Sequence, residues 1–145
     1  MSKSENSFDL IIIGGGPTGL NCAISAAKAG LNYLVIEKGV LVNSIYHFPT
    51  NMTFFSTSQV LEIGDVPFIS HGDKPTRKEA LEYYRRIIDT YAININLYEK
   101  VLDLKTTPNH FFQIKTNKSS YTCKYVIVST GYYDTPNYMN VPGED

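Results

Sequence analysis

Hydrophobic positions in the first part of the chain follow two periods, that of a buried strand and that of a helix. Phe8 to Ile13 is an apolar run of strand length, interrupted by Asp9 alone, and Tyr33 to Ile36 is a second run. Between them, Pro17 to Gly30 predicts a helix closed by a glycine. Its apolar residues recur on one face: Leu20, Ala23, Ile24 and Ala27. This strand–helix–strand order predicts two parallel strands joined by a crossover helix.

The second half of the chain has the pattern of one more helix and several strands. Thr76 and Glu79 have the spacing of a capping box. The apolar residues that follow recur at helical spacing: Leu81, Tyr84, Ile87, Ile88 and Tyr91. The cations of this helix are expected on its solvated side: Arg77, Lys78, Arg85 and Arg86. Ile93 to Leu97 then predicts a third parallel strand. An antiparallel meander is predicted over Val101 to Lys105, Phe111 to Thr116 and Tyr121 to Val128.

Residues 40–75 form a long connection rich in Ser, Thr, Asn, Pro and aromatic residues. Structureless loops of this length in compact domains usually line a binding site. Its apolar groups are Phe48-Pro49, Phe54-Phe55-Ser56 and Val66-Pro67-Phe68. Two interpretations stay open at this point: the rings pack against a flat ligand, or they cover the core.

A glycine motif, Gly14-x-Gly16-x-x-Gly19, follows the first strand directly, and Glu37 ends the second strand. Gly14 allows a tight turn, Gly16 lets a diphosphate approach the backbone, and Gly19 lets the helix lie close to the sheet. The phosphates are expected at the helix N-terminus, and a ribose diol at the Glu37 carboxylate. Because this acid repels a 2′-phosphate, the pattern favours an adenosine diphosphate with a free ribose. The order of the elements predicts a Rossmann-like domain with a central parallel sheet and a β-meander.

The composition of the chain mainly argues against certain kinds of site and partner. With 43% hydrophobic residues, 19% charged residues and a net charge of −1, the chain shows no basic excess that predicts nucleic-acid binding. No signal segment and no run of 18 apolar residues occurs, which predicts a cytoplasmic protein without a membrane partner. Cys22 and Cys123 lie too far apart for a redox motif and are expected to be buried thiols. The three histidines lack companions at ligand spacing, so no metal site is predicted.

Two motifs give the chain a resemblance to the flavoproteins with two dinucleotide-binding domains, the superfamily of thioredoxin reductase, glutathione reductase and flavin monooxygenases. They are Gly14-Gly15-Gly16-Pro17-Thr18-Gly19-Leu20 with Glu37-Lys38, and Ser129-Thr130-Gly131, which resembles an Ala-Thr-Gly crossover motif. Within that superfamily the chain is similar to the YpdA-type bacillithiol disulfide reductases over nearly its whole length. The segments that carry this closer similarity are Ile36-Glu37-Lys38-Gly39, Ser44-Ile45-Tyr46, Thr53-Phe54-Phe55-Ser56, Ile63-Gly64-Asp65-Val66-Pro67-Phe68 and Thr130-Gly131-Tyr132-Tyr133.

The resemblance implies a Rossmann-like FAD-binding domain with FAD as its cofactor. It assigns the diphosphate to the glycine turn, the adenosine ribose to Glu37, the adenine edge to the Val101 backbone and the flavin to Thr130 and Gly131. Ser44, Ile45, Tyr46 and Ser56 are candidates for the ribityl and isoalloxazine side. The complete set of predicted cofactor-binding residues is Gly14, Gly15, Gly16, Pro17, Thr18, Gly19, Glu37, Lys38, Ser44, Ile45, Tyr46, Ser56, Val101, Thr130 and Gly131. No catalytic residue is assigned.

Two departures from the family limit what the resemblance implies. Many YpdA-type proteins have Cys in the glycine turn, where this chain has Thr18, and a hydroxyl cannot form a mixed disulfide. No second glycine fingerprint follows, so residues 1–145 are expected to be the N-terminal part of a FAD-binding domain, without the NADPH-binding domain or the C-terminal FAD segment. We therefore expect the isolated chain to bind FAD weakly or not at all and to be nearly inactive. NADPH, a low-molecular-weight disulfide substrate and a homo-oligomer are expected only of the full-length protein.

Three functional hypotheses follow from these patterns. The first is the FAD-binding portion of an NADPH-dependent disulfide reductase. The second is a flavin monooxygenase-like fragment, which the aromatic segment after Glu37 and the lack of a redox Cys pair also fit. The third is a non-catalytic module that binds ADP-like ligands. A short-chain dehydrogenase is disfavoured, because Tyr83-Tyr84 and Tyr132-Tyr133 lack a Lys four places on.

Overall fold

A single six-stranded sheet organises the chain in the computed structural model, which describes residues 6–144. The strand order across the sheet is β3-β2-β1-β6-β5-β4. The strand bounds are β1 Ser7–Ile13, β2 Tyr33–Ile36, β3 Ile95–Asn96, β4 Val101–Thr106, β5 Phe112–Thr116 and β6 Ser120–Val128. Strands β3, β2, β1 and β6 are parallel, whereas β5 and β4 continue from β6 as an antiparallel meander. The predicted α/β fold is confirmed, with a third strand of only two residues.

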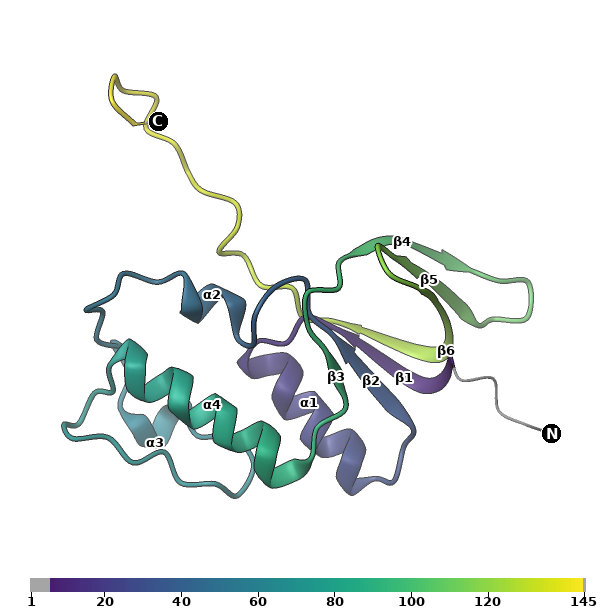
Figure 1. Cartoon of the computed structure of the whole chain (residues 1–145), viewed down its shortest axis with the longest axis horizontal. Helices are drawn as coiled ribbons and strands as arrows, with labels where there is room; N and C mark the ends of the chain where they lie inside the picture. The colour runs from purple at the N-terminus through teal and green to yellow at the C-terminus, as the bar shows by residue number, and fades with distance from the viewer. Residues whose placement is uncertain (1–5, 145) are drawn as a thin grey trace.

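Two long helices pack together on one side of the parallel strands (Figure 1). They are α1, Pro17–Lys28, and α4, Arg77–Tyr91. The Thr76 and Glu79 side chains form the predicted capping box at the start of α4. The buried face of α4 consists of Ala80, Tyr83, Tyr84 and Ile87, so the prediction is confirmed for Tyr84 and Ile87, and it missed Ala80 and Tyr83. Leu81, Ile88 and Tyr91 are only half-buried at the edges of this face.

The core is divided between the two sides of the sheet. The larger cluster lies between the parallel strands and the helices, with Ile12, Leu20 and Tyr84 among its buried members. The smaller cluster lies where the meander meets β1 and β2, and it contains Ile11, Ile36, Ile114, Tyr121 and Cys123. Since β1 contributes alternate residues to both clusters, the parallel strands are held from both faces.

The long connection 40–75 contains two short helices, α2, Asn43–Tyr46, and α3, Ser58–Leu61. The aromatic residues of this connection occupy two kinds of position. Phe68 is buried and stacks on Tyr83, with ring centroids 4.3 Å apart, so this ring covers the core. Phe48 and Phe54 also pack against the core, where they are half-buried, and in addition they line a cavity. Arg77 corrects the prediction of a solvated cation, because its Nε donates to the Ile45 carbonyl oxygen at 3.1 Å and fixes the end of α2.

Candidate functional site

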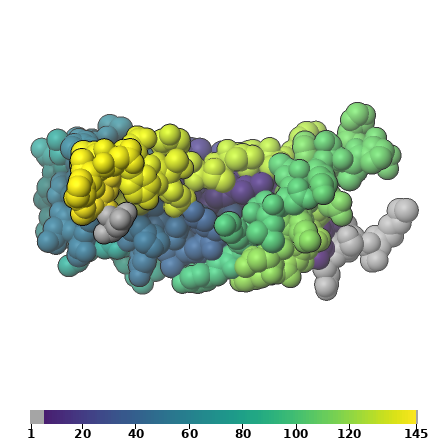
Figure 2. All heavy atoms as spheres, turned by 90° about the horizontal axis from the view of Figure 1, so that it is seen from above, coloured from purple at the N-terminus to yellow at the C-terminus, as the bar shows by residue number. Residues whose placement is uncertain are grey.

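Two adjoining cavities lie along the edge of the sheet where the parallel strands end. The larger cavity, about 300 Å³, extends from the start of α1 to the aromatic residues after α2. The smaller cavity, about 190 Å³, lies towards the start of β4. Four residues line both cavities: Glu37, Lys38, Thr130 and Asp134. Seen from above in Figure 2, the purple residues of the first strand and turn are recessed between later segments of the chain. The two cavities together form one crevice at the carboxyl ends of β1, β2 and β6.

The glycine turn after β1 has no room for side chains at two of its positions. Gly14 has a φ of +111°, and a Cβ added there would lie 2.4 Å from the Ser129 carbonyl oxygen. A Cβ at Gly19 would lie 1.9 Å from the Gly14 carbonyl oxygen. The tight turn and the close approach of helix to strand, both predicted from the sequence, are therefore confirmed.

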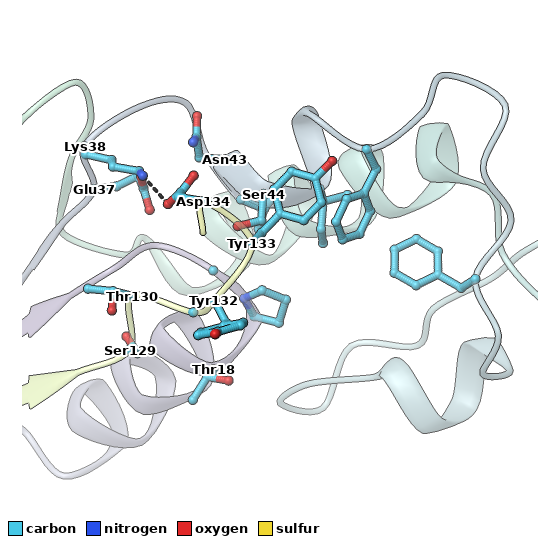
Figure 3. A pocket seen from close by; sticks show the side chains of 17 residues that line it. Thr18, Glu37, Lys38, Asn43, Ser44, Ser129, Thr130, Tyr132, Tyr133 and Asp134 are labelled. Atoms are coloured by element: carbon cyan, nitrogen blue, oxygen red, sulfur yellow. Dashed lines mark hydrogen bonds and ion pairs between the residues drawn. The ribbon is translucent and has the colours of Figure 1, made fainter. Parts of the chain in front are cut away.

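The N-terminus of α1 opens into the larger cavity. Gly16 is the N-cap, and no side chain caps this end of α1 in the described structure. A Cβ added at Gly16 would meet nothing within 4 Å. Pro17 occupies the first turn, and the exposed Thr18 follows it on the cavity wall (Figure 3). Because the first N–H groups of a helix lack partners within the helix, this end fits a diphosphate.

Glu37, at the end of β2, is 5% exposed and lies at the junction of the two cavities. Its Oε2 accepts a hydrogen bond from the Gly15 N–H at 2.7 Å, and its Oε1 accepts one from the Gly39 N–H at 3.0 Å. These two bonds hold the carboxylate beside the glycine turn. Each carboxylate oxygen has a second acceptor site, so the pair of bonds leaves capacity for a ribose diol.

An ion pair between Lys38 and Asp134 crosses the crevice from the end of β2 to the segment after β6 (Figure 3). The two side chains are 42% and 49% exposed. The segment that carries Asp134 is fixed further along the larger cavity by Tyr133, whose hydroxyl donates to the His47 carbonyl oxygen at 3.1 Å. Residues after β6 therefore contribute a wall of the crevice.

The far end of the larger cavity is aromatic. The Phe48 ring lies edge-on to Tyr133, with centroids 4.9 Å apart, and its centroid is 6.1 Å from that of Phe54. Tyr132 completes the aromatic lining, and Ile45 and Val42 add aliphatic surface. Flat conjugated ligands bind to such surfaces through their faces and edges.

The structure gathers most of the residues that the sequence predicted. Those in the lining of the crevice are Gly14, Gly16, Pro17, Thr18, Glu37, Lys38, Ser44, Ile45, Val101, Thr130 and Gly131. Gly15 and Gly19 lie behind the lining, where they support Glu37 and the turn. Tyr46 and Ser56 line neither cavity: the Tyr46 ring stands beside His47, and Ser56 is exposed.

Several lining residues were not among the predicted site residues. The larger cavity adds Val42, Asn43, Ser129, Tyr132, Tyr133 and Asp134, and the smaller one adds Ile13, Ile36, Glu99 and Lys100. Four of them, Ile36, Ser129, Tyr132 and Tyr133, occurred within segments that carry the family resemblance, whereas no motif contained Glu99 or Asp134. Their positions depend on how distant segments pack.

The cysteines lie away from this crevice. Cys123 is fully buried, and burial raises the pKa of its thiol to about 11, as expected of a structural residue. Cys22 is half-buried on α1, so the prediction of burial is only partly met there. Over residues 6–144, no group of His, Cys, Asp and Glu side chains could hold a metal ion, and no helix has the length and apolarity needed to cross a membrane.

Comparison with known sequences shows the family to which the chain belongs. Residues 11–145 match the sequence profile of a family described as pyridine nucleotide-disulphide oxidoreductase. The chain belongs to this family. It is 55% identical over 135 residues to bacilliredoxin reductase Bdr of Bacillus subtilis (strain 168), an alignment that covers 93% of this chain and 42% of that protein. The chain thus spans about two fifths of the length of this relative.

Solved structures agree with this assignment. Bacillithiol disulfide reductase Bdr (YpdA) from Staphylococcus aureus superposes with a TM-score of 0.91 at 46% identity, covering 97% of this chain and 43% of that one. A flavin-containing monooxygenase from Stenotrophomonas maltophilia has a TM-score of 0.85 at 24% identity, covering 92% of this chain and 42% of that one. The first likeness supports the expected family relation. The second, at this identity, shows a shared fold.

Proposed function

We propose that the chain forms the part of a FAD-binding domain that holds the diphosphate, the adenosine and one side of the flavin. The observation that carries this proposal is the position of Glu37, which is buried where the two cavities meet. The N-terminus of α1 lies at the larger cavity and not at the smaller one. A diphosphate at that helix end places the adjoining ribose at Glu37. The base then extends into the smaller cavity, towards the Val101 backbone.

The opposite half of the dinucleotide is assigned to the larger cavity. Phe48, Phe54 and Tyr132 offer it an apolar aromatic lining, and Thr130 and Gly131 lie on the wall beside them. A flavin bound there supplies hydride and electron transfer, while the protein supplies orientation and the surrounding charge. We assign to the hydroxyl of Thr18, an exposed residue of the cavity wall, a hydrogen bond to a phosphate oxygen; a hydroxyl offers no thiol chemistry.

For the full-length protein we propose a pyridine nucleotide-dependent flavin oxidoreductase that reduces a low-molecular-weight disulfide. The support is the 55% identity to bacilliredoxin reductase Bdr and the likeness to bacillithiol disulfide reductase structures. NADPH as the electron donor and a cytoplasmic location belong to the same proposal. No observation of the crevice favours the monooxygenase alternative, whose structural neighbours in Stenotrophomonas maltophilia are below 25% identical.

The test is a titration of the purified 145-residue chain with FAD and with ADP, followed by flavin fluorescence and by calorimetry. We expect weak FAD binding that ADP displaces competitively, since both ligands share the diphosphate and the ribose. Replacing Glu37 by Gln should lower the affinity for FAD and for ADP by about tenfold, because a ribose hydroxyl loses a carboxylate acceptor. A chain that does not bind ADP, or that binds FAD without competition by ADP, contradicts the proposal.

A further inference from the structure

Glu99 is a buried acid beside the smaller cavity, and neither the comparisons nor the sequence motifs assign it a role. It is 2% exposed. Its Oε1 accepts hydrogen bonds from the Thr116 hydroxyl at 2.6 Å and the Tyr121 hydroxyl at 2.8 Å. Its Oε2 accepts one from Asn96 Nδ2 at 2.9 Å. No cation pairs with this carboxylate among the described residues, so hydrogen bonds alone compensate for its lost hydration.

The three donors come from three different strands. Asn96 belongs to β3, Thr116 to β5 and Tyr121 to β6. Asn96 Nδ2 also donates to the Tyr121 hydroxyl oxygen at 3.1 Å, so the donors are linked to one another. Burial and the bond to Glu99 raise the pKa of Tyr121, which keeps the phenol protonated as a donor. The carboxylate therefore fixes strands from both halves of the sheet relative to each other.

The backbone around Glu99 is held as firmly as its side chain. The Glu99 N–H donates to the Glu37 carbonyl oxygen at 2.8 Å, which joins this segment to the residue assigned to the ribose. The Lys100 N–H donates to Asn117 Oδ1 at 2.8 Å, and its carbonyl oxygen accepts from the Asn117 N–H at 3.0 Å. Glu99, Lys100 and Val101 all line the smaller cavity. A short backbone segment at the cavity is thus fixed from several sides.

We propose that Glu99 is a positioning residue that fixes the backbone of residues 99–101 and thereby sets a preference for adenine over hypoxanthine in the smaller cavity. This inference rests on the proposed function. Adenine presents an acceptor at N1 and a donor at its 6-amino group, whereas hypoxanthine presents a donor at N1 and an acceptor at O6. A backbone edge distinguishes the two patterns only when its N–H and C=O groups are held in place, because hydrogen bonds weaken steeply with misalignment.

The experiment compares ADP with inosine 5′-diphosphate, two probes that share the ribose and the diphosphate and differ in the base. Their dissociation constants are measured by calorimetry on the 145-residue chain and on Glu99→Gln. The carboxylate accepts hydrogen bonds on both oxygens, whereas the glutamine side chain has one oxygen and one NH2 group. The NH2 group must face either the Asn96 amide or the two hydroxyls, all of which donate to Glu99, so the network cannot form as before. We expect the original chain to prefer ADP by about tenfold and Glu99→Gln to lower that preference to about twofold.

Two further variants separate positioning from general loss of stability. Tyr121→Phe keeps the carboxylate and removes one donor, so it should lower the preference less than Glu99→Gln; it carries the test if Glu99→Gln does not fold. Tyr83→Phe is the matched control, because its hydroxyl bonds to the Ile63 and Val66 backbone lie outside both cavities. It should lower the unfolding temperature and leave the preference unchanged.

The outcomes for the two proposals differ. An original chain that binds neither diphosphate contradicts the proposed function, and this inference with it. An original chain that prefers ADP, together with Glu99 and Tyr121 variants that keep the same preference, contradicts the inference alone. A preference that falls equally in Tyr83→Phe also overturns it, because the effect then follows stability and not the network.

Discussion

The two ends of the crevice are formed by different parts of the chain. At the smaller cavity the walls are residues at strand ends, and the Glu99 carboxylate is held by side chains of β3, β5 and β6. At the far end of the larger cavity the walls are aromatic side chains from the connection 40–75 and from the segment after β6. A strand-built wall is held by the sheet itself, whereas a loop-built wall depends on a few contacts such as that of Phe48 with Tyr133. We therefore expect changes at the two ends to separate recognition of the adenosine from recognition of the flavin.

The largest effect is expected at the glycine turn, on which both ends depend. Gly19→Ala places a Cβ 1.9 Å from the Gly14 carbonyl oxygen, so α1 must shift away from the strand. We expect a loss of about 3 kcal/mol in the free energy of unfolding, measured by urea denaturation. Gly16→Ala is the matched control, because its Cβ meets nothing within 4 Å. It should leave stability within about 0.5 kcal/mol while weakening ADP binding. Equal stability losses in the two variants would refute this account of the turn.

A smaller effect is expected from Phe48→Ala, which removes the central ring of the aromatic end. Because Phe48 is half-buried against Phe54 and Tyr133, stability should fall by about 1–2 kcal/mol. The affinity for FAD should fall about tenfold while that for ADP changes less than twofold, as titrations with both ligands can measure. Phe55→Ala, at an 88% exposed residue outside both cavities, should change neither affinity. If Phe48→Ala lowers the affinities for FAD and ADP by the same factor, the two ends do not recognise the flavin and the adenosine independently.

The contrast between the two ends also explains which parts could be predicted from the sequence. The glycine motif and the Thr76 capping box act over a few residues, and both form as predicted. The strand pattern likewise identified every element of the sheet, although β3 is shorter than predicted. Such features depend on local backbone geometry and on periodicity, which the sequence shows directly.

Residues of the loop-built wall required knowledge of the tertiary structure. Tyr46 and Ser56 were predicted near the flavin, yet the first faces His47 and the second is exposed outside the cavities. Asp134 and Glu99 were not predicted, because each is brought to the crevice by segments distant in the sequence. The Tyr83 position on α4 was missed for the same reason, since its burial depends on Phe68 in another segment.

A pH effect of moderate size is expected where the connection 40–75 meets α4. Backbone N–H groups of Thr76 and His71 donate to the Glu79 carboxylate and lower its pKa from 4.5 to about 2. Because the folded pKa lies below the unfolded one, the stabilisation is present above pH 4.5 and is lost as pH falls towards 2. Thermal unfolding should show that Glu79→Gln is less stable than the original chain by about 1 kcal/mol at pH 7, with the difference shrinking below pH 4. A difference that stays constant between pH 7 and pH 3 would contradict this origin.

The smallest effect is expected from Asp134→Asn, which breaks the ion pair with Lys38 between the two ends. Both side chains are more than two fifths exposed, so the pair should contribute less than about 0.5 kcal/mol to stability. Removing a carboxylate beside the assigned diphosphate site leaves Lys38 free to attract an anion, so ADP should bind about twofold more tightly at low salt. The gain should vanish at high ionic strength, where exposed charges are screened.

Asp65→Asn breaks a comparable exposed pair, with Lys28, outside both cavities, and should leave ADP affinity unchanged. If both variants raise the affinity equally, net charge alone accounts for the effect, and the ion pair has no particular place in the crevice.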